Sequence, residues 1–282
     1  MAVQLFKGRK LVIATMHGKE KVIAPLLEEN LGVKIIIPYN FDTDLYGTFS
    51  GEIEREADPL EAARMKAKAA CQAYQCDLAI ASEGSFGPHP SLFFVPADDE
   101  LIVFMDIKNR IEVKSREVST KTNFDGSLCK NWADAMVFAR SVKFPSHALI
   151  LRKKKQDITH LIKGINTWAG LENSCLSYLE RFGQVFLETD MRAMNNPTRM
   201  NVIGAATKKL IEKIFHQCPK CSLPGFDVFE VVAGLPCELC GFPTSSTWYY
   251  TYKCAHCYFV EKKMFPNGIK LEDPSYCDNC NP

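Results

Sequence analysis

The stretch "CDLAIASEGSFGPHP", residues 76–90, says most about how this chain folds. Its first part is a short apolar run that predicts a buried strand. Its second part holds one carboxylate, two hydroxyls, two glycines and a histidine, which predict a polar loop. Ligands of α/β sheets bind outside the carboxyl ends of the strands, so we expect this loop to form part of a site.

The residues before this stretch predict layers of strands and helices. "KLVIAT" (residues 10–15) and "VKIIIP" (residues 33–38) predict strands, with a helix between them that ends at Gly32. A second helix is expected to begin at Asp58, a capping residue followed by a proline suited to the first helical position. The hydrophobic residues of segment 39–57 follow no regular period, so this segment is predicted to be a long loop.

The residues after the stretch predict antiparallel strands added to the same sheet. Three apolar or alternating runs, residues 91–97, 100–107 and 111–124, have no helix between them. Further strands and helices follow, and the last helix is expected to begin at Asn196. The predicted fold class is therefore α/β, a mixed sheet with flanking helices over residues 1–215. Residues 216–282 are expected to form a separate small module.

The composition is that of a globular protein able to bury a core. Of the 282 residues, 46% are hydrophobic and 24% are charged. A formal net charge of +1 gives no bulk field for polyanions, so nucleic acid is not supported as a partner unless a local patch exists. The sequence shows no signal peptide and no apolar run of about 18 residues. We expect a cytoplasmic protein with no membrane partner.

Eight of the 12 cysteines form four Cys-x-x-Cys pairs after His216. Two sulfurs at this spacing can bind one metal ion, and two such pairs complete the tetrahedral site of structural zinc. The module is therefore predicted to be a zinc ribbon with two structural zinc ions. The predicted ligands are Cys218, Cys221, Cys237, Cys240, Cys254, Cys257, Cys277 and Cys280.

The spacing leaves two questions about this module open. Sequential and nested arrangements of the four Cys-x-x-Cys pairs, which we call knuckles, both fit the intervals between them. Redox-active dithiols, a disulfide cluster and an iron–sulfur centre remain alternatives to zinc. From Cys218 onward the chain has five lysines, no arginine and seven acids. This charge does not indicate binding to the phosphates of nucleic acid. We therefore expect a protein partner for the zinc module.

A phosphate site is predicted where the polar segments follow the strands. The segment after residues 10–15 offers backbone N–H groups and an amine, which favour an anion. We expect a small phosphorylated molecule there, bound by Thr15, His17, Gly18 and Lys19, with Ser82, Ser85 and His89 from the second segment.

Carboxylates complete the predicted site. Glu83 is the candidate general base or Mg²⁺ ligand, with Asp44 and Asp106 as its candidate catalytic partners. Each has a structural alternative: Glu83 as the cap of a turn, Asp44 in an Asx-turn, and His89 as an ordinary surface residue. Arg192 and Arg199 are expected to form ion pairs or to begin a helix rather than to bind phosphate.

Several long blocks of the chain resemble one family. They include "IATMHGKEKVIAPLL", "DTDLYGTFSGEIER", "LAIASEGSFGPHPS", "KFPSHALILR", "MRAMNNPTRM" and "CDNCNP". In this order they are similar to a bacterial family known as domain of unknown function 6671, over nearly the whole chain. This resemblance implies no particular activity.

A weaker resemblance concerns the order of elements in the N-terminal part. A strand, a Lys-bearing helix, an acid-capped helix and a strand ending in "SEGSFG" are similar to inosine triphosphate pyrophosphatase-like enzymes, which cleave nucleoside triphosphates with Mg²⁺. The resemblance implies phosphate binding by the first loop and a metal-supporting carboxylate at Glu83. His17 stands where those enzymes have an asparagine, and Lys19 is displaced within the loop, so triphosphate specificity does not follow.

Two functions from different classes follow from these patterns. We expect a Mg-dependent hydrolase of a phosphate anhydride or ester, with a nucleotide-like substrate. The alternative is a non-enzymatic adaptor, in which the α/β domain senses a ligand and the zinc module binds protein or nucleic acid.

Overall fold

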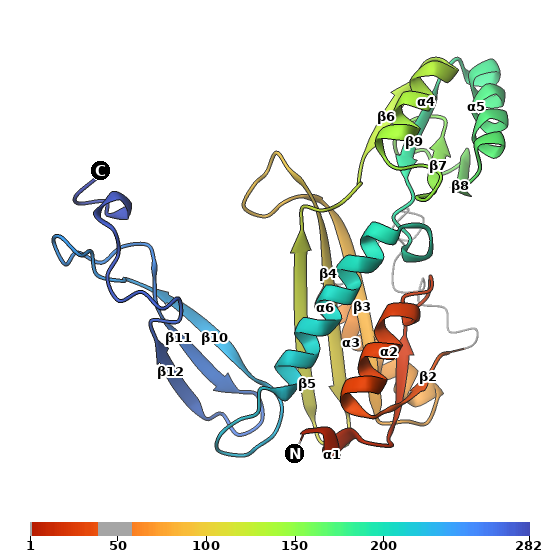
Figure 1. Ribbon diagram of the computed structural model, residues 1–282. Helices are drawn as coiled ribbons and strands as arrows, with labels where there is room; N and C mark the ends of the chain where they lie inside the picture. Colours follow the sequence, from red (N-terminus) through yellow and green to blue (C-terminus); the bar gives the residue numbers. More distant parts are fainter. Residues whose placement is uncertain (1, 39–57) are drawn as a thin grey trace.

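The computed structural model describes the backbone of residues 2–38 and 58–282 (Figure 1). Within these residues the chain forms a central sheet with helices, a second smaller sheet with its own helices, and a C-terminal three-stranded module. Asp44 and the rest of the predicted long loop lie outside the described residues. No helix in the described part of the chain has the length and apolarity needed to cross a membrane.

The central sheet is mixed, as the sequence predicts. Its strand order is β2-β1-β3-β4-β5, in which β1, β2 and β3 are parallel and β3, β4 and β5 are antiparallel. The strands are β1 (Lys10–Ala14), β2 (Lys34–Ile36), β3 (Leu78–Pro88), β4 (Pro96–Asp106) and β5 (Ile111–Ser119).

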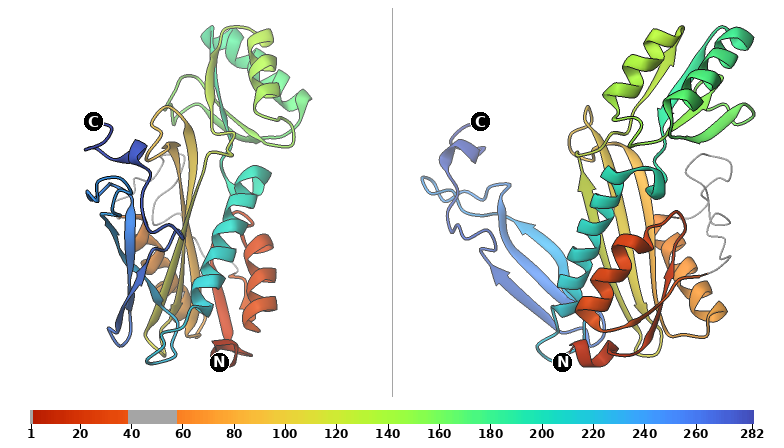
Figure 2. Two further views of the ribbon diagram at one scale, coloured as in Figure 1. Left: turned by 60° about the vertical axis from the view of Figure 1, so that its left-hand side comes forward. Right: turned by 45° about the vertical axis from the view of Figure 1, so that its right-hand side comes forward.

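Helices cover both faces of this sheet (Figure 2). Helices α2 (Glu20–Leu31) and α6 (Pro197–Phe215) pack on one face around large side chains such as Ile80 and Phe104. Helix α3 (Pro59–Ala73) packs on the other face, where alanines of the helix meet alanines of β3. A short helix α1 (Ala2–Phe6) precedes β1. The small residues beneath α3 leave room for charged side chains near its first turns.

The predicted helix boundaries have the expected physical causes. Helix α2 ends at Gly32, which adopts the left-handed conformation with φ 64°. The Asp58 carboxylate accepts a hydrogen bond from the backbone N–H of Leu60 at the start of α3. The Asn196 side chain does the same for Arg199 at the start of α6. Local capping chemistry therefore explains why these three boundaries could be predicted.

The expected loop after residue 81 is wrong, because β3 continues to Pro88. Each of its 11 residues pairs with a residue of β4, from Leu78 with Asp106 to Pro88 with Pro96. The predicted strand over residues 91–97 is instead mainly the turn of this hairpin, and β4 begins at Pro96. Continuous pairing satisfies the backbone and so overrides the local turn preference of glycine and serine.

Residues 126–189 form a lobe inserted between β5 and α6, which we call the inserted lobe. Its sheet has the order β6-β9-β7-β8 and is antiparallel. The lobe has a separate core that includes Leu149, Leu171 and Leu187. Its elements are β6 (Gly126–Cys129), α4 (Trp132–Ser141), β7 (Leu149–Arg152), β8 (Leu161–Ile165), α5 (Trp168–Phe182) and β9 (Val185–Thr189). Sequence patterns did not separate this lobe from the α/β domain.

The C-terminal module begins directly after α6. Its antiparallel sheet has the order β10-β11-β12 and extends away from the central sheet (Figure 1). An ion pair between Lys213 of α6 and Asp227 of β10, 2.5 Å, links the two parts. The elements are β10 (Phe226–Ala233), β11 (Thr247–Cys254), β12 (Val260–Met264) and a 3₁₀ turn, η3 (Pro274–Tyr276).

The ion pair at the lower end of the central sheet predicts a large loss of stability. Asp106 is 1% exposed and accepts hydrogen bonds from both terminal nitrogens of Arg9, at 2.6 and 2.8 Å. Asp106→Ala should lower the free energy of unfolding by about 3–5 kcal/mol, because it leaves a partly buried guanidinium without its main partner. Asp77→Ala removes the outer, more exposed partner of Arg9 and should cost less than about 1 kcal/mol. Urea unfolding of both variants would measure the difference, and equal losses would contradict it.

Candidate functional site

The eight predicted metal ligands gather into two groups of four. One group is Cys218, Cys221, Cys254 and Cys257, and the other is Cys237, Cys240, Cys277 and Cys280. Within each group all sulfur atoms lie within 4.8 Å of one another. The first knuckle therefore pairs with the third and the second with the fourth. The spacing left the pairing open, and the structure gives an interleaved arrangement that is neither sequential nor nested.

Strand pairing in the module explains the interleaving. Phe226 at the start of β10 is the partner of Cys254 at the end of β11, so the third knuckle lies beside the first. The second knuckle follows β10 at the other end of the sheet. There the backbone N–H of Glu272 donates to the carbonyl of Pro236 at 2.8 Å. This pairing places the segment that carries the fourth knuckle beside the second knuckle.

The sulfur geometry fits a metal ion in each group. In the first group the Cys218–Cys257 and Cys221–Cys254 sulfur distances are 3.6 and 3.7 Å, and two sulfur distances in the second group are 3.7 and 3.9 Å. A tetrahedron with metal–sulfur bonds of about 2.3 Å has edges of about 3.8 Å, whereas a disulfide bond is about 2.05 Å long. The backbone N–H groups of His256 and Cys257 also donate to Cys254 Sγ, both at 3.4 Å. These groups are thus arranged as metal-binding knuckles and not as disulfides.

The predicted Lys19 and Ser82 contact each other, from two separate segments. Lys19 immediately precedes α2, and its Nζ donates to Ser82 Oγ at 2.9 Å. This contact follows from the parallel pairing of β1 with β3, in which Ala14 is the partner of Ala81. Lys19 is 7% exposed, and burial, with the nearby Arg199 charge, lowers the pKa of its amine to about 8.

Glu83 points to the opposite face of the sheet. Its Oε1 lies 2.5 Å from Nζ of Lys66 in α3, and both residues are buried. Because side chains alternate along a strand, Ser82 faces α2 and α6 while Glu83 faces α3. The sequence prediction placed these neighbours in one loop around one hollow. The extended conformation of β3 separates them instead.

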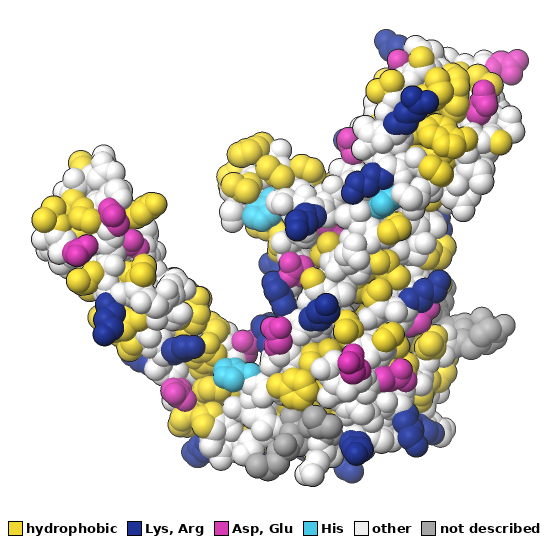
Figure 3. Space-filling view, in the orientation of Figure 1, with side chains coloured by type: hydrophobic (Ala, Val, Ile, Leu, Met, Phe, Trp, Pro, Cys, Tyr) yellow, Lys and Arg dark blue, Asp and Glu magenta, His cyan; other side chains and the backbone are white. Residues whose placement is uncertain are grey.

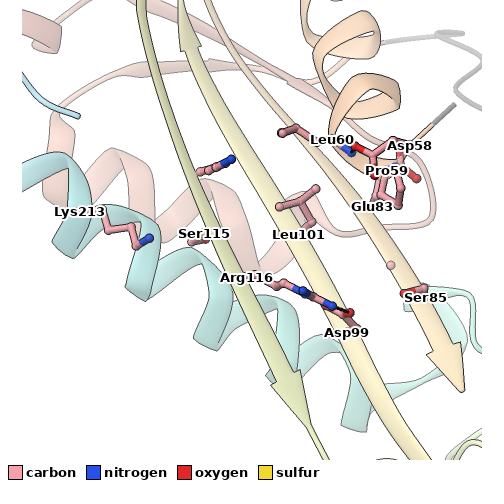
Figure 4. Close-up of a pocket in the computed structure, with 12 residues that line it drawn as sticks. Asp58, Pro59, Leu60, Glu83, Ser85, Asp99, Leu101, Ser115, Arg116 and Lys213 are labelled. Carbon is pink, nitrogen blue, oxygen red and sulfur yellow. Dashed lines mark hydrogen bonds and ion pairs between the residues drawn. The ribbon is translucent and has the colours of Figure 1, made fainter. Parts of the chain in front are cut away.

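A cavity of about 410 Å³ lies beside Glu83 at the start of α3 (Figure 4). Asp58 and Pro59 form one wall, and an ion pair between Arg116 and Asp99 forms another. Ser85 lies at the same cavity, whereas Thr15, His17 and Lys19 are not among its lining residues. The complete lining is Asp58, Pro59, Leu60, Glu83, Gly84, Ser85, Asp99, Leu101, Lys114, Ser115, Arg116 and Lys213.

Other predicted site residues lie elsewhere. Asp106 pairs with Leu78 at the far end of the hairpin, so the structure does not bring it to Glu83. His89 lies in the hairpin turn, where its Nδ1 accepts hydrogen bonds from the backbone of Ser91 and Leu92 at 3.1 and 3.2 Å.

The first predicted segment forms the turn between β1 and α2. His17 and Gly18 both adopt the left-handed conformation there, with φ 68° and 77°. The Thr15 hydroxyl donates to the carbonyl of Met16 at 3.0 Å. Local turn geometry therefore accounts for the polar and glycine content of this segment, and the side chain of Lys19 bonds to the second segment.

Sequence reasoning missed a buried acid pair on the α6 side of β4. Asp98 and Glu100 are both 0% exposed, and Arg199 Nε lies 2.6 Å from Glu100 Oε1. Among the described residues neither oxygen of Asp98 has a hydrogen-bond partner. Burial, followed by the charge of Glu100, raises the pKa of Asp98 to about 8. The signal that could have identified them is their spacing of two residues from Ile102 and Phe104, which places all four side chains on one face of a strand.

Arg199 connects this acid pair to the chain segment before α6. Its Nη1 donates to the carbonyl of Met191 at 2.5 Å, and its guanidinium lies 4.9 Å from the ring of Phe86. Gly84 is required here, because a Cβ atom would collide with Arg199 Nη2. The expectation that Arg199 forms an ion pair is thus confirmed, although the residue is buried.

The metal groups predict two ions per chain. Cys218→Ser should remove one ion and Cys277→Ser the other, because each group loses a quarter of its ligands. Cys76→Ser is the matched control, since this cysteine belongs to neither group. Elemental analysis of the purified proteins would count the ions. Loss of both ions from each single variant, or of none, would contradict two independent sites.

The acid pair predicts a pH-dependent stability. With the pKa of Asp98 raised to about 8, its stabilising contribution is present in acid and is lost as the pH rises towards 8. Asp98→Asn removes this titration, so its stability relative to wild type should rise by up to about 1.4 kcal/mol per pH unit between pH 5 and 8. Chemical unfolding at several pH values measures this difference, with Asp99→Asn as control. A difference that does not change with pH would contradict the buried acid.

Comparison with known proteins gives a family without an assigned activity. No curated protein matches the chain. The family described as domain of unknown function (DUF6671) matches residues 66–282, from within α3 to the C-terminus. This range contains Glu83, the acid pair, the inserted lobe and both cysteine groups, whereas Lys19 lies before it. Because the match covers most of its length, the chain belongs to the DUF6671 family.

Proposed function

We propose that this protein is a Mg-dependent hydrolase of a phosphate anhydride or ester in a small, nucleotide-like molecule. The observation that carries the proposal is the buried Glu83–Lys66 pair beside the cavity at the start of α3. Glu83 is 5% and Lys66 is 6% exposed, and the two side chains bond to each other. Buried charged side chains are rare because burial of the charge is costly, so this pair marks the cavity as a candidate site.

Basic residues of the same cavity supply the positive charge for phosphate. Lys114, Arg116 and Lys213 line it together with Glu83. Asp99 holds Arg116 in place through an ion pair. Lys114 is exposed, so its amine can turn to an anionic ligand in the cavity.

Glu83 supplies the carboxylate for Mg²⁺ or for activation of water. Lys66 orients it beside the cavity at the start of α3, where Asp58 and Asp99 are the other carboxylates. These residues take the role that the sequence suggested for Asp106, which lies at the other end of the hairpin. Magnesium usually binds one or two carboxylates together with substrate phosphates, so this set is sufficient. The resemblance to inosine triphosphate pyrophosphatase-like enzymes supports the same role for Glu83.

The two cysteine groups hold structural zinc in this proposal. Four thiolates in a closed tetrahedron are typical of structural zinc sites, and no ligand position is left for a substrate. The cores of the module are small, and one cluster consists mainly of the cysteines themselves with Phe226 and Tyr252. Zinc binding of about 10 kcal/mol or more per site would then dominate the stability of the module. Reduced thiolates of this kind fit a cytoplasmic location.

Activity tests this proposal directly. The protein should hydrolyse at least one member of a panel of nucleotides and sugar phosphates with Mg²⁺ and lose this activity in EDTA. Glu83→Gln and Lys114→Met should each lower kcat/KM at least about 100-fold, because each removes a charge from the cavity. Glu112→Gln and the exposed Lys68→Met are matched controls outside the cavity. Full turnover by a folded Glu83→Gln protein would exclude the proposed role of Glu83.

An adaptor function is the second candidate, and one observation favours it. The zinc module exposes large apolar side chains, among them Leu239 at 74%, Tyr258 at 71% and Phe229 at 66%. Exposed apolar groups of this kind are found at protein interaction sites. Under this function the same panel of ligands would raise the melting temperature without any turnover.

A further inference from the structure

The turn of the β3–β4 hairpin exposes two adjacent aromatic rings. Phe93 is 77% exposed and Phe94 is 86% exposed, next to the half-exposed Leu92. Figure 3 shows this apolar tip as a projection beside the inserted lobe. Two adjacent exposed phenylalanines are costly in water, so a ligand that covers them is the natural explanation.

The tip is held in one conformation by its own hydrogen bonds. The backbone N–H of His89 donates to Val95 O at 2.8 Å, and that of Val95 donates to Leu92 O at 2.9 Å. The His89 ring accepts two further bonds from the turn, from Ser91 and Leu92. His89 therefore stiffens the segment that presents the phenylalanines, and an ordered tip loses little entropy when it binds a ligand.

A cavity of about 750 Å³ separates this tip from the inserted lobe. Phe93 and Phe94 line one side, and Phe124 and Phe186 are further aromatic lining residues. Its polar groups include the Lys155 amine and the Asp125 carboxylate. This size and lining suit a flat aromatic group, and a carboxylate can accept hydrogen bonds from exocyclic amino groups.

The charge of the inserted lobe adds an independent observation. Residues 126–189 carry nine Lys and Arg against five Asp and Glu, a net charge of +4 in a chain whose net charge is +1. Three consecutive lysines, Lys153, Lys154 and Lys155, follow β7, and the last of them lines the cavity. Lys154 and Lys155 are exposed. The positive excess of the chain is therefore local, and part of it lies beside the aromatic cavity.

We infer that the cavity between the hairpin tip and the inserted lobe binds single-stranded nucleic acid. An unstacked base lies against Phe93 and Phe94, and the neighbouring phosphates lie near Lys154 and Lys155. Aromatic rings beside a basic strip are the usual means of binding single strands, because every base has a face that can stack. The inference is independent of the proposed hydrolase, whose residues line a different cavity.

The position of the tip favours a slender, flexible ligand over a membrane. The tip projects into the recess between the C-terminal module and the inserted lobe, and both of these extend further outwards (Figure 3). A flat bilayer would meet those parts first. A single strand can follow the recess to the cavity.

Fluorescence anisotropy with the full chain tests the inference. The probes are labelled 12-nucleotide dC and C oligomers at about 50 mM salt, with deoxycytidine monophosphate and a duplex of equal length as competitors. Phe93→Ala/Phe94→Ala should weaken oligomer binding about tenfold or more, because the rings that stack on bases are removed. Phe229→Ala, which removes an exposed ring of the zinc module, should leave binding unchanged.

The role of the lysines is tested separately, through the salt dependence of binding. Lys154→Gln/Lys155→Gln should reduce the slope of log K against log salt by up to about 0.7 for each phosphate that a lysine no longer neutralises. The adjacent exposed pair in β12, changed as Lys262→Gln/Lys263→Gln, is the matched control. All four phenylalanine and lysine positions tested at the cavity are exposed, so melting temperatures should stay near that of wild type.

Three results would overturn the inference. One is the absence of oligomer binding at low salt, and another is binding that the double phenylalanine variant leaves intact. The third is equal affinity for the mononucleotide and the oligomer, which would show a small-molecule pocket. Sedimentation with anionic phospholipid vesicles, abolished in the phenylalanine variant while oligomers fail to bind, would assign the tip to membranes.

Discussion

Continuous pairing between β3 and β4 governs most other features of this structure. The hairpin satisfies the backbone of eleven residues of β3 and leaves no room for a loop between Ala81 and Pro88. Side chains must then alternate between the two faces of the sheet. Ser82 and Gly84 therefore join α6 and the acid pair, and Glu83 and Ser85 join α3 and its cavity. The same hairpin carries its turn, with the two exposed phenylalanines, to the inserted lobe.

This geometry concentrates buried charge in the middle of the sheet. Lys66 balances Glu83, and Arg199 balances Glu100 within hydrogen-bonding distance. Among the described residues Asp98 lacks such a partner, and a neutral, protonated form lowers its desolvation cost. Arg199 also bonds to Met191 before α6, so the charged centre of the sheet and the connection to the inserted lobe share one side chain. The cavity lined by Phe93 and Phe186 lies near this connection, where the central sheet meets the inserted lobe.

The C-terminal module depends less on a hydrophobic core than the rest of the chain does. One small cluster of buried side chains, formed by Cys218, Phe226 and Cys254, lies at one end of its sheet. Interleaved cysteine groups hold its two ends, because each group joins knuckles that are distant in sequence. Such cross-linking restricts the chain more than two sequential sites would, since each closed loop spans another knuckle. The module can therefore stay ordered with little apolar core.

Features that depend on neighbouring residues could be predicted from the amino-acid sequence alone, and features that depend on distant partners could not. Caps at Asp58 and Asn196, the turn at Gly32, the mixed character of the sheet and the eight cysteine ligands all follow from local spacing and side-chain chemistry. So does the contact of Lys19 with the second segment, because parallel neighbouring strands bring their ends together.

The strand conformation of "SEGSFGP" instead comes from its pairing with β4, and local turn preference led to the opposite prediction. Long-range pairing also turns Ser82 and Glu83 to opposite faces and keeps Asp106 away from both. It likewise produces the interleaved metal groups and the separate core of the inserted lobe. A single sequence carries periodicity along the chain, but it does not state which strands or knuckles are neighbours in space.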